Sequence, residues 1–192
     1  METSSKIEKV QDNCAAANVT DGGEAVEKRW YAACVRMNCE RKVSSQIEAL
    51  GIETYVPQQT QIRQWSDRKK KVKVVVIPLI VFVRCTDGEA KQVEMLGSVN
   101  RLMRAPGKKT PAAIPDKQID TLRMLLDQDK VPVEFSVQKI RKGDRVKVMR
   151  GFLEGVEGVV VQVENSESLA IEIGMIGYAM VKIDKVDVRV IE

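Results

Sequence analysis

The segment 140–163, with the sequence IRKGDRVKVMRGFLEGVEGVVVQV, constrains the fold of this chain more than any other. Gly143 and Asp144 are typical turn residues, and the run after them alternates Val146 and Val148 with polar side chains. Such alternation predicts a half-buried β-strand. A second run rich in valine follows a short loop, and three glycines mark this loop and its exit: Gly151, Gly155 and Gly158. Because glycine suits a positive φ angle or a close approach, the segment predicts two strands joined by a constrained loop.

The same segment resembles a KOW motif along its whole length. KOW motifs occur in ribosomal proteins and in transcription elongation factors of the NusG type. The resemblance implies an SH3-like barrel over residues 140–192, with strands at about 144–149, 156–164, 168–173, 176–183 and 186–191. The motif residues are then Gly143, Asp144, Gly151, Phe152, Gly155 and Gly158. The alternative is an ordinary β-hairpin in another small barrel.

The chain has 192 residues, of which 44% are hydrophobic, so it can form one or two domains with a buried core. No apolar run reaches the ~20 residues that span a bilayer. The longest run, Val74–Val83, is interrupted by Pro78 and is typical of two short strands. The N-terminus lacks the basic and apolar regions of a secretory signal. We therefore expect a cytoplasmic protein with no membrane partner.

Histidine is absent, and the four cysteines show no C-x-x-C spacing. The absence of histidine excludes His-containing zinc sites, Ser-His-Asp triads and Cys-His pairs. There is also no phosphate-binding loop and no pair of carboxylates in a catalytic arrangement. We therefore expect no enzymatic activity, catalytic residue, metal or cofactor. The thiols are expected to be reduced and buried.

The net charge of +4 is distributed unevenly along the chain. Residues 1–27 hold 2 Lys or Arg and 6 Asp or Glu, whereas residues 28–125 hold 19 and 9, a net charge of +10. Residues 126–192 hold 10 Lys or Arg and 12 Asp or Glu. A basic middle segment favours a polyanionic partner, although a solvated basic surface gives the same pattern.

Composition divides the chain into a tail, two domains and a linker. Residues 1–27 are acidic and contain few large apolar side chains, so we expect a flexible tail. Residues 28–126 form the first predicted domain and residues 140–192 the second. Between them, the segment 127–139 contains a proline and little periodicity, and we expect a linker that lets the domains move independently.

The first domain is predicted to be of the α+β class, a sheet with helices packed on it. A strand over 30–36 precedes a helix that Asn38 caps and Gly51 ends. One apolar stripe of this helix is formed by Val43, Ile47 and Leu50. A second strand follows over 52–56.

Two extended runs come next and are separated by SDRKKK, which predicts a long hairpin with a basic tip. A helix over 87–96 and a short strand over 99–103 follow. Pro115 and Asp116 open a third helix. The apolar face of this last helix consists of Ile119, Leu122 and Leu126.

Several features of the first domain, taken in order, resemble the N-terminal domain of NusG-type factors. The features are Trp30-Tyr31 in the first strand, Glu40 at the start of the first helix, Pro57, Pro78 followed by Val81-Phe82-Val83, Pro111, and Ile114-Pro115-Asp116. They span residues 28–125, and the KOW-like segment follows where this family has it. The stretches around the hairpin and before the last helix are most similar to the UpxY-type paralogues, which control capsular polysaccharide operons by antitermination.

The resemblance implies that an apolar patch of the first domain binds RNA polymerase, at the clamp helices of the largest subunit. By position, the patch consists of Tyr31, Tyr55, Pro57, Pro78, Ile80 and Phe82. Family members commonly carry aromatic residues where this chain has Ile77 and Ile80, so the patch is expected to be more aliphatic. The alternative is that these strand residues belong to the core.

The basic hairpin is predicted to contact non-template or upstream DNA, because clustered cations attract phosphates without reading sequence. The predicted contact residues are Arg63, Trp65, Arg68, Lys69, Lys70, Lys71 and Lys73. Trp65 could stack on an unpaired base. The alternative is that the lysines only discourage association between hairpin edges.

For the second domain, the resemblance implies contacts with a ribosomal protein, a termination factor or an inhibitor protein. Phe152, Leu153 and Ile176 are the loop residues expected to make them. The sequence thus predicts a specialised elongation factor that promotes read-through of long operons. The alternative is a ribosome-associated or RNA-associated KOW protein, which would not need the ordered features of the first domain.

Overall fold

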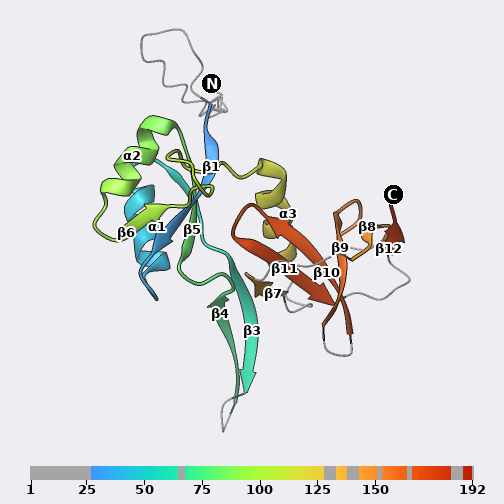
Figure 1. The fold of residues 1–192 in the computed structure, drawn as a ribbon. Helices are drawn as coiled ribbons and strands as arrows, with labels where there is room; N and C mark the ends of the chain where they lie inside the picture. Colours follow the sequence, from blue (N-terminus) through green and yellow to red (C-terminus); the bar gives the residue numbers. More distant parts are fainter. Residues whose placement is uncertain are drawn as a thin grey trace, which may run out of the picture.

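The structure, a computed structural model, describes residues 27–64, 68–127, 133–137, 143–150, 153–163, 166–182 and 188–191. These residues form a four-stranded N-terminal sheet, a two-stranded arm and a six-stranded C-terminal sheet, together with three helices (Figure 1). The predicted mixture of strands and helices is confirmed. The expected tail over 1–27 lies outside the described residues except for Glu27. Within the described part, no helix is long and apolar enough to cross a membrane.

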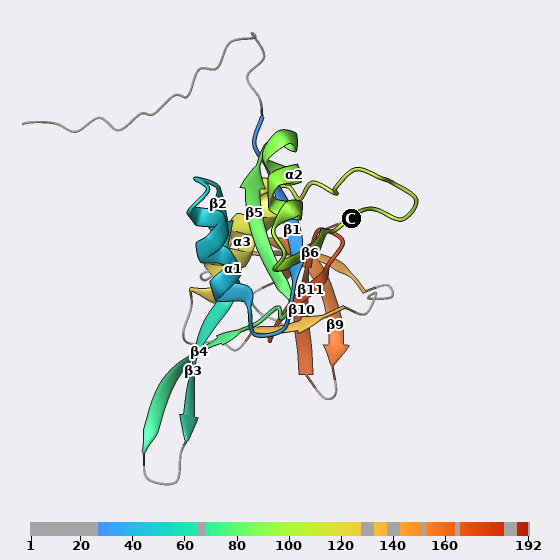
Figure 2. The same ribbon diagram turned by 90° about the vertical axis from the view of Figure 1, so that its left-hand side faces the viewer.

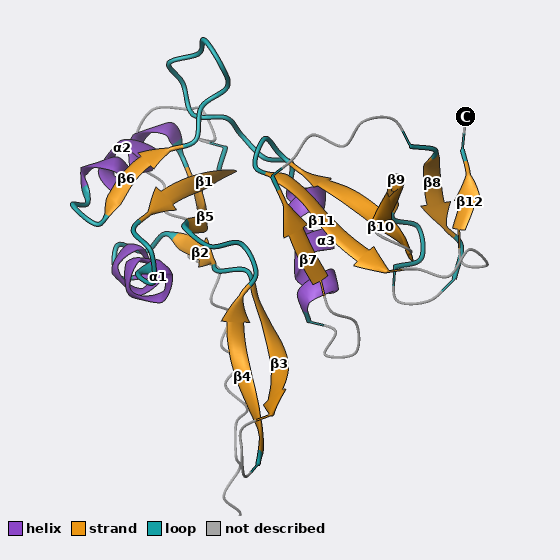
Figure 3. Ribbon diagram, turned by 60° about the horizontal axis from the view of Figure 1, so that its bottom comes forward, coloured by secondary structure: helices purple, strands orange, loops and turns teal. Residues whose placement is uncertain are grey.

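The N-terminal sheet is antiparallel and has the order β2-β5-β1-β6. Its strands are β1 (Arg29–Val35), β2 (Glu53–Tyr55), β5 (Ile80–Cys85) and β6 (Val99–Leu102). The helices are α1 (Glu40–Glu48), α2 (Asp87–Met95) and α3 (Asp116–Leu126). Figure 3 shows α1 and α2 beside this sheet, whereas α3 lies between it and the C-terminal sheet.

Alternation along β1 and β5 gives the N-terminal sheet two apolar faces. Tyr31 and Val83 point into one core, which they share with residues of α1 and α2. Trp30 and Phe82 point into the other core, where α3 supplies the predicted apolar face of Ile119, Leu122 and Leu126. Both cores hold fully buried aliphatic side chains. Because both faces are covered, few strand residues of this sheet remain available to a partner.

Helix α1 begins and ends differently from the prediction. The N-cap position is Cys39 rather than Asn38, and Asn38 instead adopts a left-handed conformation with a φ angle of 59°. Leu50 does not join the apolar stripe, because the helix ends at Glu48 and the Leu50 side chain is 49% exposed. Gly51 has a φ angle of 78°, as expected for the residue that follows a helix.

The predicted hairpin is a long two-stranded arm that projects away from the rest of the molecule (Figure 2). It pairs β3 (Gln58–Gln64) with β4 (Lys69–Val75) in antiparallel register. Two contacts fix its base. Arg41 of α1 donates a hydrogen bond to the Lys73 carbonyl (2.9 Å), and the Gln59 side chain, 3% exposed, accepts one from the Val133 amide (3.1 Å).

The C-terminal sheet has the order β12-β8-β9-β10-β11-β7. Its strands are β7 (Val133–Ser136), β8 (Arg145–Val148), β9 (Glu157–Val163), β10 (Ser166–Ile173), β11 (Gly177–Lys182) and β12 (Val188–Val190). The last five agree closely with the predicted strands. The first, β7, lies in the expected linker, where it pairs with β11 instead of leaving this part of the segment unstructured.

Helix α3 packs against the C-terminal sheet as well as the N-terminal one. The Gly174 amide donates a hydrogen bond to the Gln118 side chain at 2.7 Å. A Cβ at Gly174 would lie only 3.0 Å from Ile114, which shows how closely the two segments approach. One apolar cluster therefore runs from Phe82 through α3 to β10 and β11.

The predicted buried thiol state holds best for Cys85, which is fully buried in β5. Burial raises the pKa of Cys85 to about 12. Cys34 and Cys39 are free and half-buried, and Cys14 lies outside the described residues. Because a protonated thiol is a poor nucleophile, Cys85 acts here as a small apolar core residue.

Candidate functional site

The six residues predicted to form one apolar patch are divided between the two faces of the N-terminal sheet. Tyr31 faces α1 and α2, is 3% exposed, and donates a hydrogen bond from its hydroxyl to Asp87 at 2.9 Å. Burial, helped by this bond, raises the pKa of Tyr31 to about 12. Phe82 and Ile80 point to the opposite face and are also buried. Tyr31 and Phe82 therefore cannot belong to one exposed patch.

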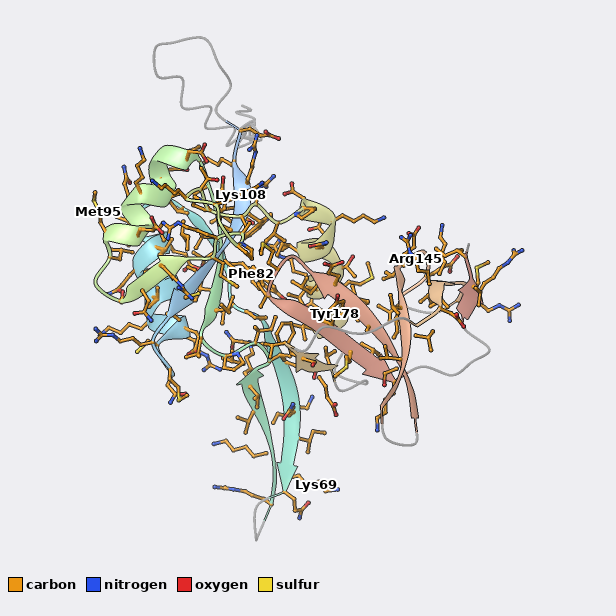
Figure 4. All side chains as sticks on the ribbon, viewed as in Figure 1. Lys69, Phe82, Met95, Lys108, Arg145 and Tyr178 are labelled. Carbon is orange, nitrogen blue, oxygen red and sulfur yellow. The ribbon has the colours of Figure 1, made fainter. Side chains whose placement is uncertain are left out.

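Tyr55 packs against the core around Phe82 instead of forming a surface. The Tyr55 ring stacks on Phe82 with a centroid separation of 6.0 Å, and Pro57 is buried. Burial raises the pKa of Tyr55 above its ordinary value. Figure 4 shows Phe82 in the interior of the molecule. Of the six predicted patch residues, only Pro78 is exposed.

Arg123 fixes α3 over this face of the sheet. Its guanidinium carbon lies 5.0 Å from the ring centroids of both Trp30 and Tyr55, and it donates a hydrogen bond to Glu53 at 3.1 Å. Arg84 pairs with Glu53 and with Asp116 at the start of α3, at 3.6 and 3.1 Å. These contacts hold α3 on the face that contains Ile80 and Phe82, so this part of the predicted patch is covered.

An exposed apolar tip, formed by Met37, Pro78 and Leu79, lies at one end of the N-terminal sheet. Met37 is 68% exposed and Leu79 is 40% exposed. The two turns that carry these residues are joined, because the Val35 amide donates to the Leu79 carbonyl at 2.9 Å. The Leu79 amide donates to the carboxylate of Glu40, also at 2.9 Å, and Glu40 is buried.

Leu79 has a φ angle of 66°, a left-handed conformation that is rare for a bulky residue. Such a conformation costs about 1–2 kcal/mol for an L-residue. It persists only where surrounding contacts hold it, and these positions cluster at functional sites. Sequence reasoning missed Leu79 and Met37, because neither positive φ nor the joining of the two turns can be read from residue types.

The basic residues of β4 are exposed, but Lys69, Lys70 and Lys71 lie within this strand rather than in the tip where they were predicted. Arg68, Lys69, Lys70, Lys71 and Lys73 are all exposed, and Figure 4 shows Lys69 near the far end of the arm. Arg63 is the strand partner of Lys70. Trp65 lies outside the described residues. The described parts of the two strands carry no Asp or Glu.

The glycines of segment 140–163 sit where a side chain would not fit. A Cβ at Gly143 would come within 1.9 Å of the Val160 carbonyl oxygen, and one at Gly158 would come within 2.7 Å of the Ala170 carbonyl oxygen. Gly155 has a φ angle of 83°. The Asp144 carbonyl accepts a hydrogen bond from the Val160 amide at 3.0 Å. The constrained turn predicted from these glycines is therefore present.

Two residues of the C-terminal domain that were expected to make exposed loop contacts are buried. Leu153 and Ile176, predicted as exposed loop contacts, are only 3% and 8% exposed and belong to the core. Gly151 and Phe152 lie outside the described residues. Among the described residues, no group of three or more His, Cys, Asp or Glu side chains could hold a metal ion.

We expect Gly158→Ala to destabilise the C-terminal sheet by about 2 kcal/mol, because the added methyl group would force the β9–β10 pair apart. Gly97→Ala is the control, since nothing lies within 4 Å of its Cβ position. In thermal unfolding, the first variant should melt about 4–8 °C lower and the second close to the wild type. Equal melting temperatures for both variants would contradict the close approach at Gly158.

A family model described as transcription termination factor NusG matches residues 28–123. The matched region is half of the chain and contains the N-terminal sheet, the arm and most of α3. The chain belongs to the NusG family. In this NusG-family protein, the match includes both the apolar tip and the arm, whereas the C-terminal sheet lies beyond it.

Similar solved structures include NusG of Thermotoga maritima, from a structure on its domain interaction. It is 23% identical, with a TM-score of 0.48, over 88% of this chain and 100% of that chain. An MjSpt4:Spt5 complex in conformation A is 16% identical, with a TM-score of 0.28, over 84% and 97% of the two chains. The same complex in conformation B is 17% identical, with a TM-score of 0.31, over 81% of this chain and 99% of that chain. No curated protein sequence matches the chain significantly.

Proposed function

We propose that this NusG-family protein binds RNA polymerase and promotes read-through of particular long operons, with surface or capsular polysaccharide operons as the favoured class. The match of the NusG family to residues 28–123 is the observation that carries the proposal. The protein acts by binding and stabilises one state of its partner, without catalysing a reaction. It works in the cytoplasm, where transcription takes place in bacteria.

The apolar tip is the proposed contact with the clamp helices of the largest polymerase subunit. Its three side chains are exposed, and both backbone groups of Leu79 are hydrogen-bonded. A surface held in its bound conformation loses little entropy on association, which favours affinity. The buried members of the earlier patch, such as Phe82, then support this surface from within rather than touching the polymerase.

The basic arm is proposed to lie against nucleic acid next to the polymerase. Its exposed cations can neutralise phosphates without reading sequence. The C-terminal sheet is proposed to be a KOW-type, SH3-like module that contacts a ribosomal protein, a termination factor or an inhibitor protein. The close approaches at Gly143 and Gly158 and the positive φ angle of Gly155 support this assignment, because they reproduce the constrained turn that the motif requires.

The proposal is tested by binding and by transcription with purified components. The protein should bind RNA polymerase and lose that binding when the clamp helices are deleted. On a template with a pause and a terminator, the protein should raise the fraction of full-length transcripts. Binding that does not depend on the clamp helices would contradict the proposed contact. Association with ribosomes, together with unchanged read-through, would favour the RNA-associated alternative.

A further inference from the structure

The two faces of the arm carry different side chains. In an antiparallel pair, directly opposite residues point to the same side, and neighbours along a strand point to opposite sides. The register therefore places Lys69, Lys71 and Lys73 on one face. Their partners on β3 complete this face and are Gln64, Ile62 and Thr60. Lys70, Val72 and Val74 point to the other face.

Exposure differs between the two faces along part of β4. On the first face, Lys69, Lys71 and Lys73 are exposed and Val75 is half-buried. On the second face, Val72 and Val74 are half-buried and Lys70 is exposed. At a rise of about 3.4 Å per residue, lysines two positions apart are about 7 Å apart along the strand. The three lysines thus form a straight row, which we call the lysine row.

The lysine row continues toward the body of the protein. The Arg41 guanidinium donates a hydrogen bond to the carbonyl of Lys73, so a fourth cation lies next to the inner end of the row. Neither described strand of the arm contains an acidic residue. A straight row of regularly spaced cations is complementary to a linear polymer with regularly spaced anions.

We propose that the lysine row binds the phosphate backbone of one nucleic-acid strand that runs along the arm, and that the opposite face, with Lys70, Val72 and Val74, does not take part. The proposal rests on the proposed function, which brings the arm next to nucleic acid. Lysine ammonium groups act as point charges toward phosphates. The Thr60 hydroxyl lies on the same face and can donate a further hydrogen bond to the backbone. Such contacts carry no sequence preference.

The test compares two variants of the full chain with equal loss of charge. The row variant is Lys69→Gln/Lys71→Gln/Lys73→Gln. The control variant is Lys70→Gln/Lys108→Gln/Lys109→Gln, which changes the other face of the arm and an exposed loop between β6 and α3. Figure 4 shows Lys108 far from Lys69. Binding to a labelled 15-nucleotide single strand, and separately to a duplex of the same length, is measured from 50 to 200 mM salt.

In the row variant, the slope of log K against log salt concentration should decrease in magnitude by about 2 to 3. Each lost phosphate contact lowers this magnitude by about 0.7 on a single strand and about 0.9 on a duplex. The control variant should change this slope by less than 1. Dividing the change by about 0.7 for the single strand and by about 0.9 for the duplex gives the number of lost contacts, and the form with the larger number is the form of nucleic acid that the row binds. Lys71→Gln should flatten the slope more than Lys70→Gln, although both remove one charge from the same strand.

Three results would overturn the proposal. Equal slopes for the wild type and the row variant mean that the lysines serve solubility only. Equal flattening by both triple variants means that overall charge, rather than one face, attracts the nucleic acid. Binding of a 15-residue poly-glutamate peptide as tight as that of DNA, with the same loss in the row variant, means that the partner is an acidic protein. Binding of the wild type to polymerase is measured in parallel. If the wild type does not bind polymerase, the proposed function is contradicted, whereas the comparison of salt slopes still tests the lysine row.

Discussion

Replacing both Tyr31 and Phe82 with alanine is expected to unfold the N-terminal sheet, not to weaken a partner contact on an intact surface. Both side chains are almost fully buried, and they lie in different cores on opposite faces of the sheet. Removing a large buried aromatic side chain costs about 3–5 kcal/mol, and each of the two changes leaves a cavity in a different core. Their sum approaches the roughly 5–15 kcal/mol that stabilises an entire domain.

Circular dichroism and thermal unfolding of the double variant check this expectation. Tyr31→Phe is the matched control, because it keeps the ring in the core and removes only the hydrogen bond to Asp87, at a cost of about 1 kcal/mol. The control should melt cooperatively a few degrees below the wild type. A double variant that melts at the wild-type temperature would show that neither ring is packed in a core.

The sequence predicted the elements of the first domain well, because their signals are local. Alternating apolar residues predicted β1 and β5, and a stripe of Ile119, Leu122 and Leu126 predicted α3. The face on which α3 packs is not a local property. Its contacts come from distant parts of the chain: the Arg123 guanidinium carbon lies 5.0 Å from the ring centroids of Trp30 and Tyr55, more than 65 residues away in sequence.

The site was predicted less completely, because the exposure of a side chain also depends on contacts between distant parts of the chain. The basic hairpin followed from a run of lysines between two extended segments, and the structure contains this hairpin, with Lys69, Lys70 and Lys71 inside β4 rather than in the tip. The apolar patch was inferred by position within a family, which cannot distinguish a surface residue from a core residue. Whether Phe82 or Leu79 is exposed depends on the order of four strands and on a buried carboxylate, Glu40, from another element.

The second domain was also predicted only in part from local patterns. The five predicted strands are present, because glycines and alternating valines mark their ends and faces. Strand β7 was not predicted, since four residues with little periodicity give a weak local signal and its pairing partner, β11, is distant in sequence. Leu153 and Ile176 were assigned to loops correctly, but these loops fold back and bury both side chains.

Changing Leu79 to aspartate is expected to lower polymerase affinity by at least a hundredfold while leaving the protein folded. A hundredfold loss corresponds to about 2.7 kcal/mol, which is within the range for a hot-spot residue whose replacement buries an unpaired charge. The side chain is 40% exposed, so its replacement does not remove a core contact comparable with Phe82. Met95→Asp is the matched control, because Met95 is 84% exposed on α2 and does not belong to the apolar tip. Figure 4 shows its place on this helix.

Leu79→Gly separates a role in binding from a role in folding. Glycine adopts the left-handed conformation without the cost of about 1–2 kcal/mol that leucine bears, although it loses about 0.5–1 kcal/mol through greater freedom in the unfolded chain. We therefore expect Leu79→Gly to be as stable as the wild type or slightly more stable, yet to bind polymerase about tenfold more weakly. Thermal unfolding and titration against purified polymerase measure the two effects.

A glycine variant that gains stability and binds as tightly as the wild type would show that the strained leucine makes no contact with the polymerase. A variant that loses stability would show that Leu79 is held in place for packing rather than for binding.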